Sequence, residues 1–368
     1  MKKIKILFVI PRFSVGGAEK FIVHSFPALN RDTFAPSLIT IFREKKDSCA
    51  NEVHIDHCFQ FRSTWDIAAF IRLYAYMKRE KFDVVVTHLF VANLLARIAA
   101  IIAGVPVIVS YEHNIYPNKR YWQIVMDFLL AKKTNRIIVD SNAASAFTAQ
   151  QESIPIGKFT TLFIPPLLDE RPRRSPEMLR KELGIEDDAP VVLCVSRLVV
   201  DKGHLYLVEA APVIFARHPR AHILIGGWGP LQESLESQVQ ALGLGKRVRL
   251  LGRVDGQEFL NLADVYVDPS ISTDLPIGIM EAMREGKAIV ATEVGDIPAF
   301  VQNNETGITV PPADPESLGA AISKLLDDAS LRARFGEAAT KRVAKYSLDA
   351  YMTAFEKLIV DLYGTRTH

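Results

Sequence analysis

Short runs of aliphatic and β-branched residues alternate with longer segments of helical periodicity along the whole chain. In the first half, the short runs predict strands at Ile4–Ile10, Ser37–Phe42, Val84–Thr87, Val107–Tyr111, Ile137–Val139 and Thr161–Ile164. The segments between them predict helices near Ala18–Leu29, Trp65–Glu80, Asn93–Ala103, Tyr121–Lys133 and Ser141–Gln151, with Ser141 as an N-cap. This order is typical of parallel βαβ units.

The same alternation starts again after residues 165–190, where prolines and clustered charges are typical of a linker. Strands are predicted at Val191–Ser196, Ile223–Ile225, Val248–Leu251, Val265–Val267, Ala288–Thr292 and Gly307–Val310. Helices are predicted near Leu205–Arg217, Leu231–Leu242, Glu258–Ala263, Gly278–Glu285, Pro315–Asp328, Leu331–Lys345 and Leu348–Leu362. The pattern predicts an α/β fold of two tandem Rossmann-like parallel sheets, in domains 1–168 and 169–347, with ligands in an interdomain cleft at the carboxyl ends of the strands.

Composition and charge narrow the class of protein. The 368 residues are 49% hydrophobic and 23% charged, as in a globular protein, and the net charge is only +2. The first 168 residues hold 21 basic and 13 acidic side chains, so the net charge is +8 over the first half and −6 over the second. Three cysteines form no disulfide framework and favour a reducing compartment, so we expect a cytoplasmic protein. The longest apolar stretch, Ile98–Val109, is too short to span a bilayer, which needs about 20 residues.

Two glycine-rich turns follow predicted strands. Gly16 and Gly17 open the first predicted helix, where two backbone N–H groups can approach an anion at the positive helix end. Gly227 lies in a similar turn after Ile223–Ile225, but no third glycine completes a dinucleotide fingerprint. A tight βα turn without a ligand is an equal alternative for both.

Charged side chains gather at the predicted carboxyl edge of the second sheet. Arg197 ends a strand and Lys202 precedes a helix, so both can neutralise a departing diphosphate, although a solvated loop is the alternative. Ile277 and Gly278 enter a helix whose N-terminal amides face the same edge. Glu281, one turn further, can accept hydrogen bonds from two ribose hydroxyls or complement the helix dipole.

Nearly the whole chain resembles the retaining two-Rossmann (GT-B) glycosyltransferases of family 4, also called group 1. The resemblance rests on an ordered set of motifs: Gly16-Gly17-Ala18-Glu19, Glu112-His113-Asn114, Val195-Ser196-Arg197-Leu198 with Lys202-Gly203, Gly227-Trp228-Gly229-Pro230, Leu251-Gly252-Arg253-Val254, Asp268-Pro269-Ser270, Glu281-Ala282-Met283 and Gly286. It implies transfer of a sugar from a nucleotide diphosphate donor with retained anomeric configuration. It also implies that the helix within residues 348–368 crosses back to the first domain.

The resemblance carries roles to individual positions. Arg197 and Lys202 would hold the donor diphosphate, Glu281 the ribose, and the backbone near Val254 the base. His113 would lie beside the donor sugar and stabilise positive charge through its backbone or its ring, with Glu112 and Asn114 on the acceptor side. The departing phosphate would take the proton of the acceptor, which fits a site without an obvious carboxylate pair.

The chain departs from the family pattern at two places. A glutamate that reads donor sugar hydroxyls would fall at Thr273, with Asp274 one position later, so either residue can replace it. Residues 164–169 lack the usual Pro-Asn-Gly before Asp169, so the hinge geometry is expected to differ. No Asp-x-Asp occurs, which disfavours the metal-dependent single-Rossmann class, and we expect no metal or other cofactor.

Three further patterns have competing interpretations. Cys49, His54, His57 and Cys58 are close enough in sequence for zinc, although their spacing matches no common pattern. His88 follows a predicted strand and is an acceptor-side candidate or a packing residue. Residues 118–133 form a basic, aromatic-flanked helix that either packs on its sheet or lies on the inner membrane face. No motif supports nucleic-acid binding.

These observations predict a metal-independent transferase of hexosyl or N-acetylhexosaminyl groups. Its partners would be a nucleotide sugar and a glycan or lipid-linked acceptor in surface polysaccharide biosynthesis. Two alternatives stay open: a nucleotide-sugar epimerase or phosphorylase of the same fold, and a protein that binds a nucleotide sugar with little or no turnover.

Overall fold

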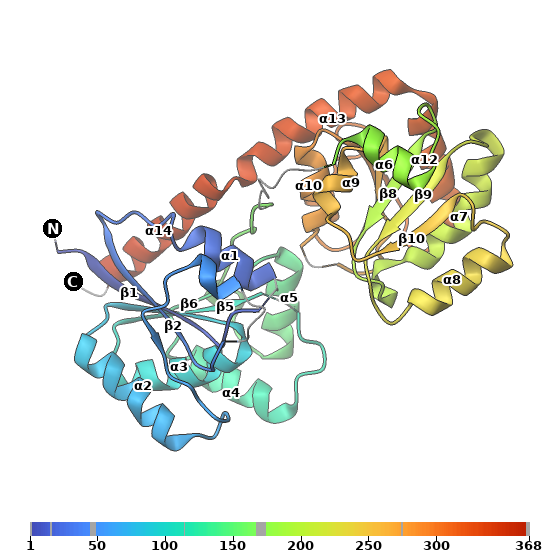
Figure 1. Ribbon diagram of the computed structural model, residues 1–368. Coiled ribbons are helices and arrows are strands. Elements are labelled where there is room, and N and C mark those ends of the chain that lie inside the picture. The colour runs from blue at the N-terminus through green and yellow to red at the C-terminus, as the bar shows by residue number, and fades with distance from the viewer. Residues whose placement is uncertain are drawn as a thin grey trace. The chain divides into compact units, whose positions relative to one another are not determined.

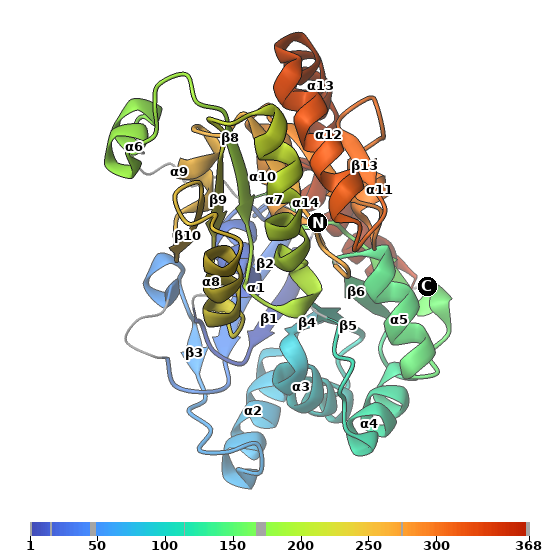
Figure 2. The same ribbon diagram turned by 90° about the vertical axis from the view of Figure 1, so that its right-hand side faces the viewer.

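A computed structural model describes residues 2–14, 17–44, 49–113, 115–166, 174–273 and 275–365. The chain divides into two compact units, each with its own parallel sheet (Figures 1 and 2). The first unit comprises Met1–Ile164 with Leu348–His368, and the second comprises Pro165–Ser347. The predicted pair of Rossmann-like parallel sheets is confirmed.

The sheet of the first unit has seven parallel strands in the order β3-β2-β1-β4-β5-β6-β7. Its strands are β1 (Ile4–Ile10), β2 (Phe34–Thr40), β3 (His57–Cys58), β4 (Val84–His88), β5 (Val107–Glu112), β6 (Arg136–Val139) and β7 (Phe159–Thr161). Its helices are α1 (Gly17–Ser25), η1 (Cys49–Glu52), α2 (Ile67–Glu80), α3 (Leu89–Ala103), α4 (Tyr121–Ala131), α5 (Asn142–Gln151), η2 (Ile156–Lys158) and α14 (Leu348–Gly364). The strand order reverses between β1 and β4, where ligands of such sheets bind.

The sheet of the second unit has six strands in the order β10-β9-β8-β11-β12-β13, again all parallel. Its strands are β8 (Val191–Val195), β9 (His222–Gly226), β10 (Val248–Gly252), β11 (Val265–Asp268), β12 (Ala288–Thr292) and β13 (Ile308–Val310). Its helices are α6 (Pro176–Leu183), η3 (Val200–Lys202), α7 (His204–Arg217), α8 (Gln232–Ala241), α9 (Gly256–Leu260), α10 (Ile277–Arg284), α11 (Ile297–Phe300), α12 (Pro315–Asp327), α13 (Ala329–Val343) and η4 (Ala344–Tyr346).

Local signals set the helix ends. The Ser141 hydroxyl accepts a hydrogen bond from the Ala144 N–H at 2.9 Å, so the predicted N-cap of α5 is confirmed. The interpretation of residues 165–190 as linker is wrong for part of its length, because α6 lies within it. Ser175 caps α6, Pro176 occupies its first turn, and Gly184 ends it at φ 60°. The predicted strand at Thr161–Ile164 lies instead at Phe159–Thr161.

The last helix packs on the first unit. The Phe21 and Tyr351 rings meet edge to face with centroids 4.8 Å apart, and the Glu356 carboxylate accepts a hydrogen bond from the Asn30 N–H at 2.8 Å. Tyr351, Phe355 and Ile359 of α14 are buried. The described helices include none that is both long and apolar enough to span a membrane.

Candidate active site

Three polar side chains end neighbouring strands of the first unit. His88 is the last residue of β4, His113 follows β5, and Asp140 follows β6. His88 Nδ1 lies 3.0 Å from His113 Nε2, and His113 Nδ1 lies 3.2 Å from Asp140 Oδ2. Both ring nitrogens of His113 therefore have side-chain partners. The His113 and Asp140 side chains are only 2% and 10% exposed.

Aromatic rings stack beneath this row. Tyr111 on β5 and His113 directly after the strand are two residues apart, so they lie on one face, with ring centroids 4.1 Å apart and nearly parallel planes. The ring of His88 stacks on Tyr111 at 5.3 Å and on Phe8 at 5.9 Å. The Tyr351 hydroxyl donates to the Tyr111 hydroxyl at 3.2 Å. Helix α14 thus contacts Tyr111, the ring on which both histidines stack.

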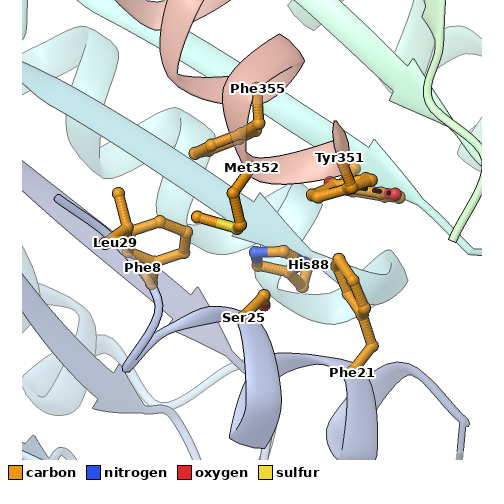
Figure 3. A pocket seen from close by; sticks show the side chains of 9 residues that line it. Phe8, Phe21, Ser25, Leu29, His88, Tyr351, Met352 and Phe355 are labelled. Atoms are coloured by element: carbon orange, nitrogen blue, oxygen red, sulfur yellow. Dashed lines mark hydrogen bonds between the residues drawn. The ribbon is translucent and has the colours of Figure 1, made fainter. Parts of the chain in front are cut away.

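His88 also borders a small cavity, shown in Figure 3. Its walls are Phe8, Phe21, Ser25, Leu29, His88, Tyr111, Tyr351, Met352 and Phe355, and its space is that of about one water molecule. His88 Nε2 is buried without a hydrogen-bond partner in the described structure. Burial, followed by the nearby His113, holds the pKa of His88 well below its usual value, so its ring is neutral.

Glu112 lies on the other face of β5, in a buried polar network. Its Oε1 accepts a hydrogen bond at 2.8 Å from Asn93, whose amide oxygen accepts one from Thr87 at 2.6 Å. Glu112 is buried, and burial raises its pKa. Its second oxygen has no partner in the described structure. The predicted acceptor-side role of Glu112 thus has little support, because the carboxylate faces the protein interior.

A cluster of four more buried charges adjoins Glu112. Arg97 pairs with Asp127, and Lys119 pairs with both Asp127 and Glu152. Burial alone would lower the pKa of Lys119, but the surrounding carboxylates raise it above its usual value. Burial, and then the charge of Asp127, raises the pKa of Glu152 to about 7. The three carboxyl groups of Glu112, Asp127 and Glu152 outnumber the two cations, Arg97 and Lys119. The cluster therefore favours the binding of one additional proton by a carboxyl group.

The cluster predicts a pH dependence of stability. Because the folded chain binds the Glu152 proton more tightly than an unfolded chain with a pKa of 4.5, the stability that this proton confers is full below pH 4.5 and is lost as the pH rises through 7. We expect the free energy of unfolding to fall by up to about 3 kcal/mol across this window. Urea titrations at several pH values measure the slope. Glu152→Gln should flatten it and the exposed Glu209→Gln should not; equal slopes in all three proteins would contradict the assignment.

The cluster also corrects one part of the predicted basic helix. Lys119 is buried among carboxylates and adds nothing to a basic surface. Exposed side chains do remain at the start and end of α4: Arg120, Tyr121, Trp122, Phe128, Leu129, Lys132 and Lys133. The Lys132 ammonium lies 4.7 Å from the centre of the Phe128 ring.

In the second unit, the two predicted cations follow β8 and differ in environment. Arg197 is exposed, and its guanidinium has no hydrogen bond or ion pair among the residues described. Lys202 is half-buried at the end of η3 and donates a hydrogen bond to the Thr273 hydroxyl at 2.9 Å. Thr273, which the resemblance places at the position of the family glutamate, thus contacts the predicted diphosphate-binding lysine.

The loop that carries Lys202 is held tightly to the next strand end. Asp201 C=O accepts hydrogen bonds from the Ile271 and Ser272 N–H groups at 2.8 and 3.2 Å. Gly203 has a φ of +62°, and a methyl group at its Cα would overlap with the carbonyl oxygen of Pro269. Glycine is therefore required by both conformation and space at this position.

The remaining predicted donor residues lie on three elements. Gly227, at φ +142°, crosses so close to Ser196 C=O that no side chain fits. Val254 follows β10 and its side chain lies against Gly226. Ile277 and Gly278 begin α10, with Glu281 one turn in. Since strands β8 to β11 are parallel, these residues all belong to the carboxyl edge of one sheet.

Two buried polar residues were not identified from the sequence: Asp140 beside His113 in the first unit, and His204 beside Ser196 in the second. Asp140 directly follows strand β6, in a Val-Asp-Ser segment that has no unusual feature in the sequence. Burial lowers the pKa of His204 to about 4, and its Nε2 lies 3.0 Å from the Ser196 hydroxyl. Asp140 could have been found by asking which polar residue ends the strand beside His113.

Other predicted residues have separate outcomes. Gly17 begins α1, whereas Gly16, Asn114 and Asp274 lie outside the described residues. The zinc interpretation of Cys49, His54, His57 and Cys58 is not supported, because the described residues contain no group of three or more metal-binding side chains. The Cys49 and Cys58 thiols instead donate to backbone carbonyls, those of Ser14 and Phe42.

Comparison with solved structures defines the fold. A crystal structure of Anabaena HepE with UDP matches with a TM-score of 0.82 at 20% identity, over 97% of this chain and 100% of that one. The lipopolysaccharide outer core galactosyltransferase WaaB matches with a TM-score of 0.75 at 16% identity, over 97% and 99%. Two parallel-sheet units in this arrangement along the chain are the GT-B fold of glycosyltransferases.

Family comparisons name the family. Residues 15–161 match Glycosyltransferase Family 4, and residues 176–342 match Glycosyl transferases group 1. The chain belongs to the group 1, family 4 glycosyltransferases and is a glycosyltransferase.

Among its relatives is a UDP-Gal:alpha-D-GlcNAc-diphosphoundecaprenol alpha-1,3-galactosyltransferase of Escherichia coli, 26% identical over 98% of this chain and 97% of the relative. An alpha-D-kanosaminyltransferase of Streptomyces kanamyceticus is 36% identical over 47% of this chain. The alignment spans about half the length of that relative and of several others.

Proposed function

We propose that the protein transfers a hexosyl or N-acetylhexosaminyl group, with retention, from a nucleotide diphosphate sugar to a glycan or lipid-linked acceptor. The observation that carries the proposal is the pair Arg197 and Lys202 at the carboxyl edge of the second sheet. The Arg197 guanidinium has no hydrogen bond or ion pair among the described residues, and Lys202 is half-buried against a neutral hydroxyl. Two cations without described carboxylate partners suit the charge that develops on a departing diphosphate.

The other residues of the second unit supply recognition in this proposal. The N-terminal amides of α10, from Ile277 and Gly278 onward, face the same sheet edge and favour an anion. Glu281 accepts hydroxyl groups of the ribose, and the backbone near Val254 meets the base. Thr273 or Asp274 takes the place of the family glutamate toward the donor sugar. Side-chain cations and helix amides meet the phosphate charge in this scheme, so it requires no metal.

The first unit supplies the site of sugar transfer. The His113 ring is held on both sides and its side chain is only 2% exposed, so in this proposal its backbone is the part fixed for contact with the donor sugar. The departing phosphate takes the proton of the attacking acceptor hydroxyl, the acceptor oxygen bonds to the anomeric carbon, and the bond to the phosphate oxygen breaks. No carboxylate of the described site is needed as a base.

Relatives and surface support the class of acceptor. The Escherichia coli relative is named for a diphosphoundecaprenol-linked acceptor. The exposed aromatic and basic side chains of α4, namely Arg120, Tyr121, Trp122, Phe128, Lys132 and Lys133, suit an anionic bilayer. We therefore propose peripheral contact with the inner membrane face in surface polysaccharide assembly in the cytoplasm. Co-sedimentation with anionic vesicles, unchanged on replacing Trp122, Lys132 and Lys133 by serine, would count against this contact.

A panel of nucleotide sugars tests the function. We expect one donor to raise the melting temperature of the folded protein, because a ligand stabilises the state that binds it by RT ln(1 + [L]/Kd). The same donor should yield a product of unchanged anomeric configuration when an acceptor with a lipid-linked diphosphate is added. Interconversion of the donor without acceptor, or a requirement for inorganic phosphate, would support an epimerase or phosphorylase instead. Binding without any turnover would support a nucleotide-sugar-binding protein.

A further inference from the structure

The row of His88, His113 and Asp140 has a single consistent hydrogen-bond order when Asp140 is a carboxylate and both imidazole rings are neutral. A carboxylate only accepts, so His113 Nδ1 must carry the hydrogen that bridges the 3.2 Å to Asp140 Oδ2. A neutral His113 then has a lone pair on Nε2. His88 Nδ1, at 3.0 Å, must therefore be the donor. The lone pair of His88 Nε2 is left facing the small cavity, in agreement with its lack of a partner in the described structure.

The geometry around this row is rigid. The rings of His88 and His113 both stack on Tyr111, whose hydroxyl is held by Tyr351 of α14. The 2% exposure of the His113 side chain leaves no room for a second rotamer without moving Tyr111 or His88. Both nitrogens of the ring are engaged, so the ring can neither turn over nor exchange tautomers unless Asp140 or His88 releases it.

We propose that His88 and Asp140 are positioning residues that hold the His113 ring in one orientation and one tautomer during sugar transfer. This assignment rests on the proposed function, because it depends on His113 meeting the donor sugar. It replaces the acceptor-side role of His88, whose side chain is buried against Phe8 and Tyr111. Asp140 and His88 act only through His113 and touch no reacting atom.

The role of the ring nitrogens can be separated from that of packing. His88→Phe keeps a flat ring for stacking on Tyr111 but removes the donor to His113. His88→Asn keeps an N–H near the position of Nδ1. We expect His88→Phe and Asp140→Ala to lower kcat about 10- to 100-fold, the effect of a displaced reacting group, with the donor Kd changed less than about threefold. His88→Asn should recover most of the loss. Exposed His24→Asn and Asp32→Asn serve as matched controls.

Nitrogen-15 NMR of histidine-labelled protein supplies a readout independent of activity. In the native protein we expect both His113 and His88 to be protonated on Nδ1, and in Asp140→Ala we expect His113 to lose that preference. If the native protein transfers sugar but these variants keep more than half of kcat, or if native His113 carries its proton on Nε2, the positioning role is wrong and the proposed function stands. If the native protein transfers no sugar from any donor, both proposals fail.

Discussion

Replacing Lys202 by alanine is expected to lower kcat at least ~100-fold, the magnitude seen when one preorganised donor to a developing anion is removed. Lys202 is half-buried, and its ammonium is already oriented by the Thr273 hydroxyl at 2.9 Å. Because the ammonium is already oriented, little reorganisation of its surroundings is needed when the diphosphate departs. The loss should therefore appear in kcat more than in donor binding.

Arg197→Ala is expected to give a loss of similar size, with a larger share in donor affinity, because its exposed guanidinium must be ordered on binding. Steady-state kinetics over a range of donor concentrations separates kcat from KM. Lys246→Ala removes an exposed lysine of the same unit, beyond α8, and is the matched control. Near-normal kcat in both the Lys202 and Arg197 variants would place the diphosphate elsewhere and remove the main support for the proposed function.

The architecture was predictable because its signals are local and repeated. Within the described residues thirteen strands form the two sheets, and the runs of Val and Ile that mark most of them are visible in the sequence. The two-residue strand β3 has no such run, and it is held by its register with β2, a pairing that only the folded chain shows. Helix α6 was missed although Ser175, Pro176 and Gly184 mark its ends, because the prolines around it suggested a linker.

Candidate site residues could be predicted only where their type and position in the sequence are unusual. Arg197 and Lys202 are cations placed at the end of a predicted strand, and Gly203 and Gly227 lie where the structure shows close backbone approach. The partner of His113 did not stand out, since Asp140 becomes its neighbour only through the β5–β6 register. Glu112 was predicted to lie on the acceptor side because it is next to His113 in the sequence. Successive residues of a strand face opposite sides, so its side chain lies instead in the buried network near Arg97 and Lys119.

Gly203→Ala is expected to damage both stability and turnover. Two effects add at this position: a left-handed φ of +62° and overlap of the new methyl group with Pro269 C=O. The left-handed conformation alone costs about 1–2 kcal/mol for a non-glycine residue, and forced overpacking adds about 1–3 kcal/mol. Relief requires the η3 loop to move away from Pro269, which would weaken the bonds from Ile271 and Ser272 to Asp201 and displace Lys202.

Gly243→Ala separates the two effects. Gly243 has almost the same φ, +67°, but an added methyl group would meet nothing within 4 Å. It should therefore show the conformational cost alone, while Gly203→Ala should melt about 2–12 °C lower than Gly243→Ala, since 1 kcal/mol shifts a unit of this size by about 2–4 °C and the overlap adds about 1–3 kcal/mol. Below both melting points, Gly203→Ala should also lose at least ~100-fold in kcat, because an ångström of displacement at a reacting group has that effect. If the two variants matched in melting temperature and in kcat, the contact between Gly203 and Pro269 would not be what places Lys202.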